Sequence, residues 1–470
     1  MIRVGILSFS DGRERVHESL KEYIIACEER IKKSLEETKE VECFSASYII
    51  CNNELARTQP IELAAKNPDV VILNVPVFAF PNFSAIAVSL QHVPCLAIAP
   101  INGMLPGLGG LQAAVNMVRQ VGLQCEKVWG NIEDAKTLTK VLSFIRAAHA
   151  AARLKGQVYG VFGGRSIGMG SGTISPDLWM KVFGVDTEHI DQLEIIRRAE
   201  IIEEEKVESA FNWLQKNMGS IVYDESKLTE STLKQQIRAY YATKAIINER
   251  KLNFVGVKCH YELSEYYFTQ CLSAAFFNDP YDWDGPKDPI VYSCEADSDG
   301  ALTMQIMKLI SGKPVLFFDF RHYDGKDKVF TFCNCGAMAT WYAAQSEDPL
   351  VNLSETTLCP VIPKYAGGGC HVRYIAKAGE MTFARLTRCL DQYKLTMFKG
   401  NFKSMPPKKL EETCEAWPHG FVEVGVDPDV LIDRYDNNHV HAIAGDYIEE
   451  LRKFCEIKGI GCDIIGEGRK

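Results

Sequence analysis

The first third of the chain alternates short apolar runs with longer helical patterns, and this order constrains the fold more than any other feature. Residues 2–7, 70–75 and 94–99 are short runs rich in strand-forming side chains. Residues 16–35 and 111–121 carry apolar side chains at helical spacing. Alternating strands and helices predict a parallel sheet with helices on both faces. Loops at the carboxyl ends of such strands commonly carry function.

The strand-loop-helix pattern starts again at residues 158–162, and this restart is the clearest domain boundary. Further strands are predicted at residues 254–257, 289–294 and 314–319, with a helix at 302–310. This pattern indicates a second α/β domain.

After about residue 312 the apolar runs become shorter, and Gly and Pro become frequent. Residues 328–332 and 370–375 are typical of antiparallel strands, and residues 447–454 of a charged helix. We therefore predict an α/β chain with two doubly wound, Rossmann-like α/β domains and a β-rich C-terminal domain. The predicted borders are residues 1–155, 156–312 and 313–470.

Size and composition narrow the class of protein. A chain of 470 residues is too long for one hydrophobic core. The net charge of -9 and the scattered basic residues argue against nucleic acid as a partner. No apolar run approaches the ~18 residues of a membrane helix, and the start lacks the apolar core of a signal peptide. The sixteen cysteines include no CxxC pair, which fits reduced thiols in a cytoplasmic protein.

The glycine-rich segment 163–170, GGRSIGMG, follows a predicted strand. Its spacing is not that of the dinucleotide-binding GxGxxG pattern, and residues 171–176 delay the next helix, so a nucleotide site is disfavoured. Glycines that allow tight turns, with Arg165 and Ser166 offered to a polar ligand, are the better interpretation.

Acidic residues end two successive predicted strands. Glu295 follows an apolar run, and Asp297 and Asp299 come next, just before a helix. Helix capping and the helix dipole account for Asp297 and Asp299. A carboxylate at the end of a buried strand, such as Glu295, needs a partner. Asp319 ends the following strand in the same way, and neighbouring parallel strands would place Glu295 and Asp319 in one crevice, where they attract a divalent cation.

A histidine would complete such a metal site. His439 and His441 stand in a polar turn, and a strand there would place both on the same side, so spacing leaves both open. Glu, Asp and His together favour Mn²⁺, with Co²⁺ or Mg²⁺ as alternatives. Trp417, before Pro418 and His419, offers an aromatic face of the kind common in sugar sites, although a buried Trp is equally common in cores.

These segments resemble the L-fucose isomerase family, within the group that also contains L-arabinose isomerase. The likeness spans nearly the whole chain, in DGRERVHESL, GGRSIGMG, FGVDTEHID, CEADSDGALTMQIMKLISG, PVLFFDFRH, NCG, AWPHGF and NNHVHAIAGD. It implies an Mn²⁺-dependent aldose-ketose isomerase, an intramolecular oxidoreductase of carbohydrate metabolism. The implied metal ligands are Glu295, Asp319 and His439, with His441 in reserve.

The resemblance also implies which residues contact the sugar hydroxyls: Arg13, Gln270, Trp417 and Asn438. It further implies a homotrimer or homohexamer whose active sites lie at subunit interfaces. The expected partner is a small-molecule sugar, with neither nucleic acid nor membrane involved.

The expected reaction passes through a metal-bound cis-enediolate, with Glu295 and Asp319 sharing the roles of acid and base. The substrate stays open among L-fucose, D-arabinose and a C6-modified hexose such as sulfoquinovose. A sulfonate would need a cationic clamp, for which Arg165, Lys258 or Arg13 are candidates. The rival functions are a non-catalytic sugar-binding protein and a metal-dependent aldolase or lyase that uses the same enediolate.

Overall fold

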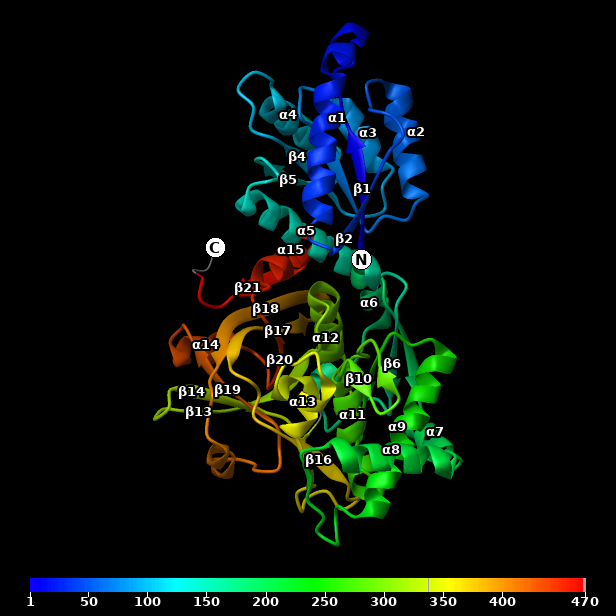
Figure 1. Cartoon of the computed structure of the whole chain (residues 1–470), viewed down its shortest axis with the longest axis vertical. Coiled ribbons are helices and arrows are strands. Elements are labelled where there is room, and N and C mark those ends of the chain that lie inside the picture. Colours follow the sequence, from blue (N-terminus) through cyan, green and yellow to red (C-terminus); the bar gives the residue numbers. More distant parts are fainter. Residues whose placement is uncertain (337, 468–470) are drawn as a thin grey trace. The chain divides into compact units, whose positions relative to one another are not determined.

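The computed structural model describes residues 1–336 and 338–467. The chain forms two compact units (Figure 1). Unit 1 comprises residues 1–153 and 449–459, and unit 2 comprises residues 154–448 and 460–467. No helix among these described residues is long and apolar enough to cross a membrane.

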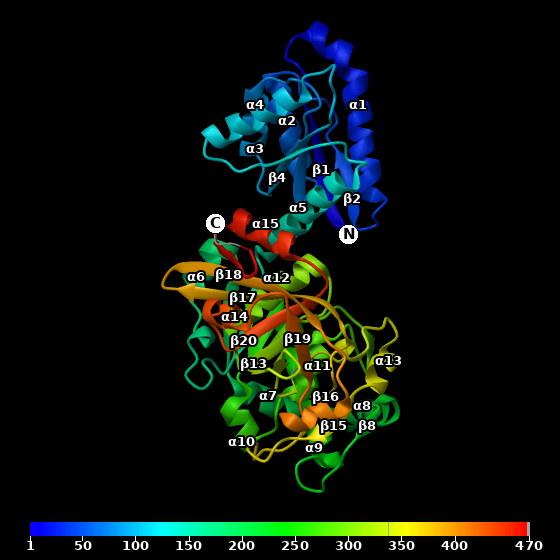
Figure 2. The same cartoon turned by 90° about the vertical axis from the view of Figure 1, so that its left-hand side faces the viewer.

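Unit 1 is built on a parallel sheet of strand order β2-β1-β3-β4-β5. Its strands are β1 (Ile2–Ser8), β2 (Val41–Ser45), β3 (Val70–Asn74), β4 (Cys95–Ala99) and β5 (Glu126–Trp129). Every residue of β3 and β4 is buried, because helices cover both faces. Figure 2 shows α1 (Glu14–Glu36) and α5 (Ala135–Leu154) on one face, and α2 (Asn53–Ala64), α3 (Pro81–Ser89) and α4 (Gly107–Gln120) on the other.

The C-terminal helix α15 (Ile448–Lys458) packs into unit 1. Its buried Glu450 accepts hydrogen bonds from Arg146 Nη1 at 3.0 Å and from Ser143 Oγ at 3.1 Å, both on α5. Unit 1 therefore includes a helix from the other end of the chain.

Unit 2 contains a second parallel sheet, of order β12-β9-β6-β7. Its strands are β6 (Val158–Phe162), β7 (Asp186–Ile190), β9 (Phe254–Val257) and β12 (Tyr292–Cys294). The helices of this part are α6 (Pro176–Phe183), α7 (Gln192–Ala199), α8 (Glu204–Asn217), α9 (Glu230–Arg250), α10 (Ser264–Tyr266), α11 (Cys271–Asn278) and α12 (Ser298–Ser311). The strands predicted at residues 158–162 and 254–257 are confirmed.

The rest of unit 2 is dominated by antiparallel strands in the order β17-β20-β13-β14-β19-β18-β21. These are β13 (Leu316–Asp324), β14 (Val329–Cys333), β17 (Gly379–Cys389), β18 (Gln392–Phe402), β19 (His419–Val424), β20 (His439–Ala444) and the parallel addition β21 (Gly461–Ile464). A further pairing of β17 with β18 closes six of them into a ring. Phe332 of β14 and Phe383 of β17 lie 5.6 Å apart although their strands are not neighbours, so aromatic rings fill the inside.

Shorter elements flank this ring. They are a small sheet of β8 (Ser220–Ile221), β15 (Thr357–Pro360) and β16 (Cys370–Arg373), the hairpin of β10 (Tyr281–Asp282) and β11 (Gly285–Pro286), and the helices α13 (Pro349–Ser354) and α14 (Pro428–Arg434).

The predicted fold class is confirmed in its main features, a mixed α/β chain with parallel sheets and a β-rich C-terminal part. The expectation that the strands ending in Glu295 and Asp319 are parallel neighbours is wrong. β12 belongs to the parallel sheet, whereas β13 pairs antiparallel with β14 and β20. β13 continues past Asp319 to Asp324 and turns back as a hairpin, which the apolar run before Asp319 does not reveal. The predicted domain borders stay predictions.

A chain of hydrogen bonds joins the parallel sheet to the ring inside unit 2. Trp179 of α6 is fully buried, and its indole N–H donates to the Tyr393 hydroxyl of β18 at 2.8 Å. That hydroxyl in turn donates to Asp299 Oδ1 of α12 at 3.2 Å. The indole also packs against Tyr159 and Phe254 of the parallel sheet.

Replacing Trp179 should therefore weaken the whole of unit 2. We expect Trp179→Ala to lower the free energy of unfolding by about 3–5 kcal/mol, because it empties a large buried volume and removes the hydrogen bond donated to the Tyr393 hydroxyl. Urea unfolding measures this. Ile201→Ala, at a side chain that is 80% exposed, should change stability by less than about 0.5 kcal/mol, and equal effects of the two substitutions would contradict the packing described.

Candidate functional site

Two carboxylates, which follow or lie in strands of two different sheets, approach one nitrogen of a buried imidazole. His439 Nε2 lies 3.5 Å from Glu295 Oε2 and 3.5 Å from Asp319 Oδ1. Glu295 directly follows β12, and Asp319 and His439 face each other across the β13–β20 pair. His439 is 1% exposed, while the side chains of Glu295 and Asp319 are 17% and 35% exposed, so a ligand can reach the carboxylates.

The donor types and distances of this cluster fit a divalent cation. Donors that share one such ion at roughly 2.0–2.2 Å are themselves separated by about 3–3.7 Å, which brackets both 3.5 Å distances. Within residues 1–336 and 338–467, no three His, Cys, Asp or Glu side chains form a preformed metal centre. The fit therefore rests on the donor chemistry and on the two distances to the His439 nitrogen.

Asp297 orients the imidazole from its other side. Its Oδ2 lies 2.7 Å from His439 Nδ1, and Arg385 binds the same carboxylate with both terminal nitrogens, at 2.6 and 3.0 Å. Oδ1 also accepts the Gly300 amide at 3.0 Å, which confirms Asp297 as the cap of α12. A carboxylate at Nδ1 holds an N–H there, so that Nε2 is the nitrogen that faces Glu295 and Asp319 and that a metal would take.

The electrostatics of the cluster favour a positive charge. Burial opposes the charge on Asp297, but Arg385 and His439 hold the pKa of its carboxyl well below its usual range. Burial alone would lower the pKa of His439, whereas its contacts with Asp297 and Glu295 raise it to about 10. Burial raises the pKa of Asp319, with His439 opposing. The negative carboxylates around His439 thus favour a protonated imidazole, and the same negative charge would attract a metal cation.

The structure separates the two histidines that the sequence left open. His441 lies next to Arg385, whose Nη1 is 3.0 Å from its Nε2, and packs against Phe317. Burial and the Arg385 charge lower the pKa of His441. Of the two imidazoles, it is His439 that the fold brings to Glu295 and Asp319.

The backbone that carries Glu295 adopts an unusual conformation. Glu295 and Ala296 have φ values of 58° and 50°, in the left-handed region that side chains rarely enter. The Ala296 amide donates to Val257 O at 3.1 Å. A Cβ at Gly256 of β9 would lie 3.2 Å from Ala296 Cα and 2.1 Å from the Tyr159 hydroxyl. The close approach of β9 therefore fixes this turn, and residues held in such conformations are concentrated at functional sites.

Two of the predicted sugar contacts present unpaired polar atoms. Gln270, which caps α11, is 2% exposed and its Oε1 has no hydrogen-bond partner among the described residues. Trp417 is 5% exposed, and its Nε1 likewise has none. Buried polar atoms are normally paired, so both atoms are available to a ligand. Asn438 is exposed and directly precedes His439, with its carbonyl accepting the Phe320 amide at 2.7 Å.

The predicted arginines are engaged elsewhere. Arg165 is exposed and folds back on its own loop, where Nε donates to Met169 O at 2.9 Å and Nη2 to Gly168 O. Its neighbour Ser166 is buried and donates to His260 O at 2.7 Å. Arg13 belongs to unit 1 and pairs with Asp11 at 2.7 Å.

Sequence reasoning missed Arg385 and the second role of Asp297. Capping already accounted for Asp297, and its partners lie 88 and 142 residues away along the chain. Arg385 did carry a signal, since it interrupts the apolar centre of β17 and is 1% exposed. A basic residue buried in a strand requires an acid nearby.

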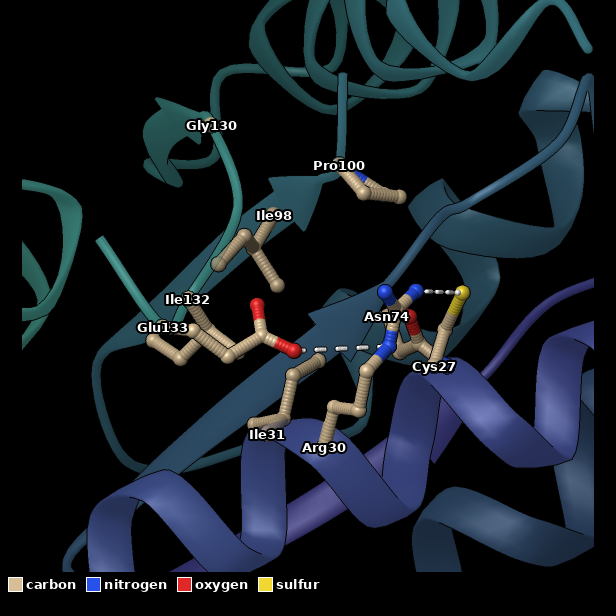
Figure 3. A pocket seen from close by; sticks show the side chains of 9 residues that line it. All are labelled: Cys27, Arg30, Ile31, Asn74, Ile98, Pro100, Gly130, Ile132 and Glu133. Atoms are coloured by element: carbon tan, nitrogen blue, oxygen red, sulfur yellow. Dashed lines mark hydrogen bonds and ion pairs between the residues drawn. The ribbon is translucent and has the colours of Figure 1, made fainter. Parts of the chain in front are cut away.

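Unit 1 contains a small cavity, lined by both apolar and polar side chains, between α1 and the ends of β3 and β4 (Figure 3). The Arg30 guanidinium lies between Cys27 Sγ at 3.1 Å and Glu133 Oε1 at 3.6 Å. The free space of about 10 Å³ suffices for one water molecule. A sugar does not fit there, so this cavity is not a candidate sugar site.

Comparison with known proteins gives consistent matches along the chain. The family model for the first N-terminal domain of L-fucose isomerase matches residues 1–156, that for the second N-terminal domain matches 157–256, and that for the C-terminal domain matches 332–465. L-fucose isomerase of Haemophilus influenzae strain PittEE is 25% identical, over 80% of this chain and 76% of that protein. L-fucose isomerase of Citrobacter koseri is 23% identical, over 88% and 83% of the two chains.

Among solved structures, a periplasmic solute-binding protein of an ABC transporter from Actinobacillus succinogenes, with bound D-allose, matches at 12% identity over 67% of this chain and 93% of that chain. Its TM-score of 0.17 supports no statement about the fold. The three domain models and the curated relatives together confirm the resemblance seen in the motifs, and the chain belongs to the L-fucose isomerase family.

Proposed function

We propose that this protein is a metal-dependent aldose-ketose isomerase. The observation that carries the proposal is the convergence of Glu295 and Asp319 on one nitrogen of His439, in a chain of the L-fucose isomerase family. The relatives that bear the name L-fucose isomerase match most of this chain.

Glu295, Asp319 and His439 would hold the metal, with Mn²⁺ ahead of Co²⁺ or Mg²⁺ because the set combines two carboxylates with an imidazole. A bound divalent cation supplies Lewis-acid polarisation of the sugar oxygens O1 and O2, worth several kcal/mol. Asp297 and Arg385 keep the imidazole in the tautomer that a ligand needs.

The carboxylates then carry the protons of the reaction. One of them removes the proton from C2 of the aldose and returns it to C1, while the other moves the hydroxyl proton between O2 and O1. No atom is gained or lost, so the step needs no outside oxidant. Both oxygens lie 3.5 Å from the same nitrogen, and this closeness supports a shared role at one substrate. Gln270, Trp417 and Asn438 would hold the sugar hydroxyls.

The rival functions explain less of this arrangement. A sugar-binding protein has no need for two partly exposed carboxylates backed by a buried Asp–His–Arg chain. An aldolase or lyase would break a carbon–carbon bond, whereas the named relatives are isomerases. L-fucose, D-arabinose and C6-modified hexoses such as sulfoquinovose remain the candidate substrates. The sixteen free thiols support the cytoplasm as the compartment.

We further propose that unit 1 contributes to the active site of a neighbouring subunit, in a trimer or hexamer. Exposed apolar side chains gather at the carboxyl edge of its sheet: Tyr48, Phe78, Phe80, Ile101, Met104, Leu108 and Trp129. Several line a hollow of about 390 Å³. Apolar residues grouped at one edge favour contact with another chain, and Arg13 follows β1 at this same edge.

Metal removal tests the cofactor. Dialysis against a chelator should abolish aldose-ketose conversion, and Mn²⁺ should restore it. Because Asp297 holds the imidazole, Asp297→Asn should need about 10–100-fold more Mn²⁺, as measured by ketose formation against free Mn²⁺. Asp299→Asn is the matched control and should titrate like the wild type, since the Asp299 carboxylate accepts the Tyr393 hydroxyl, whereas it is Asp297 that holds His439. Full turnover by metal-free protein would contradict the mechanism.

Glu295→Gln tests the proton transfer directly. Loss of an acid or base that handles a proton should lower kcat by about 10²–10⁴-fold, while the thermal unfolding temperature stays near that of the wild type. Glu423→Gln is the control, because Glu423 is a half-exposed glutamate of β19 that pairs with Lys403. Wild-type turnover in the Glu295 variant would remove this residue from the chemistry.

Mixing two inactive variants tests the shared site. Arg13→Gln and Glu295→Gln should each be inactive alone. Subunits of the two variants, unfolded together and reassembled in equal amounts, should recover about a quarter of wild-type activity. With random assembly, about one interface in four combines an intact Arg13 from one subunit with an intact Glu295 from its neighbour. Recovery near zero would show that Arg13 and Glu295 act within one subunit, and full activity of Arg13→Gln alone would show that Arg13 has no role.

A further inference from the structure

Two cationic side chains lie over the same buried indole ring. Arg321 Cζ is 5.6 Å and Lys364 Nζ is 5.8 Å from the ring centre of Trp417. Trp417 is 5% exposed and its Nε1 is an unpaired donor among the described residues. Arg321 and Lys364 are themselves exposed. An aromatic platform, a free N–H and two cations are thus gathered at one place.

Neither cation forms an ion pair. Within residues 1–336 and 338–467, Arg321 and Lys364 have no salt bridge or hydrogen bond, and they lie against the rings of Trp417 and Tyr365. The Arg321 charge also acts on the nearby Asp319, where it opposes the rise in the pKa of that carboxyl. A cation over an aromatic face gains about 0.5–1 kcal/mol at an exposed site. Both charges also act on one thiol, that of Cys414, where they oppose the rise in its pKa that burial causes.

The three cations that the sequence suggested for an anion are, by contrast, already bound. Arg165 donates to carbonyls of its own loop, Lys258 pairs with Glu262 and Arg13 pairs with Asp11. The structure thus shifts the search for a clamp from these residues to Arg321 and Lys364.

This cationic pair is close in the fold to the proposed reaction site. Asp319 of β13, Cys333 of β14 and His419 of β19 face one another across adjacent strands, with His439 of β20 on the other side of Asp319. Arg321 follows Asp319 by two residues, and Trp417 precedes His419 by two. A substrate held by Asp319 can therefore extend along this row of strands to the Trp417 ring.

We propose that Arg321 and Lys364 bind an anionic group at the far end of the sugar, with Trp417 packed against the carbon chain. The proposal rests on the isomerase function and narrows its substrate class to an aldose with a phosphate or sulfonate at C6, rather than a neutral 6-deoxyhexose. The Arg321 fork can bind two oxygens of a tetrahedral anion, and Lys364 supplies a point charge.

Matched substrates test this directly. Ketose formation is measured for aldoses of one configuration that carry hydroxyl, phosphate or sulfonate at C6, together with L-fucose and D-arabinose. We expect KM for a charged aldose to be at least tenfold lower than for its neutral counterpart. The phosphate and the sulfonate series then show which anion is preferred.

Variants separate the clamp from the chemistry. Arg321→Met and Lys364→Met should each raise KM for the charged aldose at least tenfold, and leave KM for the neutral aldose within about twofold. Lys403→Met, at an exposed lysine that pairs with Glu423, should change neither value. Phosphorus NMR with inorganic phosphate gives a second readout, in which wild-type protein should broaden the signal more than the double variant.

The outcomes distinguish the two proposals. Isomerisation of neutral aldoses with equal or lower KM would overturn the anionic clamp and leave the isomerase function intact. Equal loss of activity on charged and neutral aldoses in the variants would assign the two cations to folding or to the reaction itself, and also overturn the clamp. Conversion of none of the aldoses by metal-loaded protein would overturn both.

Discussion

The fully buried carboxylate of Asp297 is the interaction on which the candidate site depends. It joins three parts of unit 2, because it caps α12, binds Arg385 of β17 and holds His439 of β20. Isolated charges are costly to bury, and this one is tolerated because each oxygen has at least two donors. Loss of any partner would leave an uncompensated charge inside the protein. The position of α12 against the ring is thereby tied to the orientation of the imidazole.

The contact between Asp297 and His439 explains how Glu295, which follows a strand of the parallel sheet, is held close to Asp319 and His439 of the ring. Glu295 stands two residues before Asp297, so the contact that fixes Asp297 on His439 also fixes where Glu295 can point. The left-handed backbone at Glu295 and Ala296 costs of order 1–3 kcal/mol per residue. Hydrogen bonds on both sides of the turn, from Ala296 to Val257 and from Asp297 to Cys294, hold it in place. The site is therefore rigid where it presents the carboxylate, as preorganised chemistry requires.

Much of this arrangement could be predicted from the sequence, because its signals are local. Runs of apolar residues placed β1, β3, β6 and β9, and acids at strand ends pointed to Glu295 and Asp319. The relation between the strands was beyond such signals, since an apolar run ending in an acid is the same whether its neighbour is parallel or antiparallel. The choice between His439 and His441 was equally out of reach. Both alternate onto one side of β20, and contacts with Asp297 and Arg385, from distant segments, decide between them.

The cationic side chains considered as anion clamps likewise divide into those with partners nearby in the sequence and those with partners brought close by the fold. Arg13, Arg165 and Lys258 lie within four residues of the groups that bind them, so their pairing is a property of short segments. Arg321 and Lys364 form no ion pair with an acid nearby in the sequence. The fold brings both of them to one indole ring instead. Cations that form no ion pair beside a reaction site still attract an anion, although the nearby Asp319 carboxylate weakens that attraction at Arg321. Under the proposal, the substrate preference of this chain is set by charges at the end of the sugar, apart from the carboxylates and imidazole that are proposed to perform isomerisation.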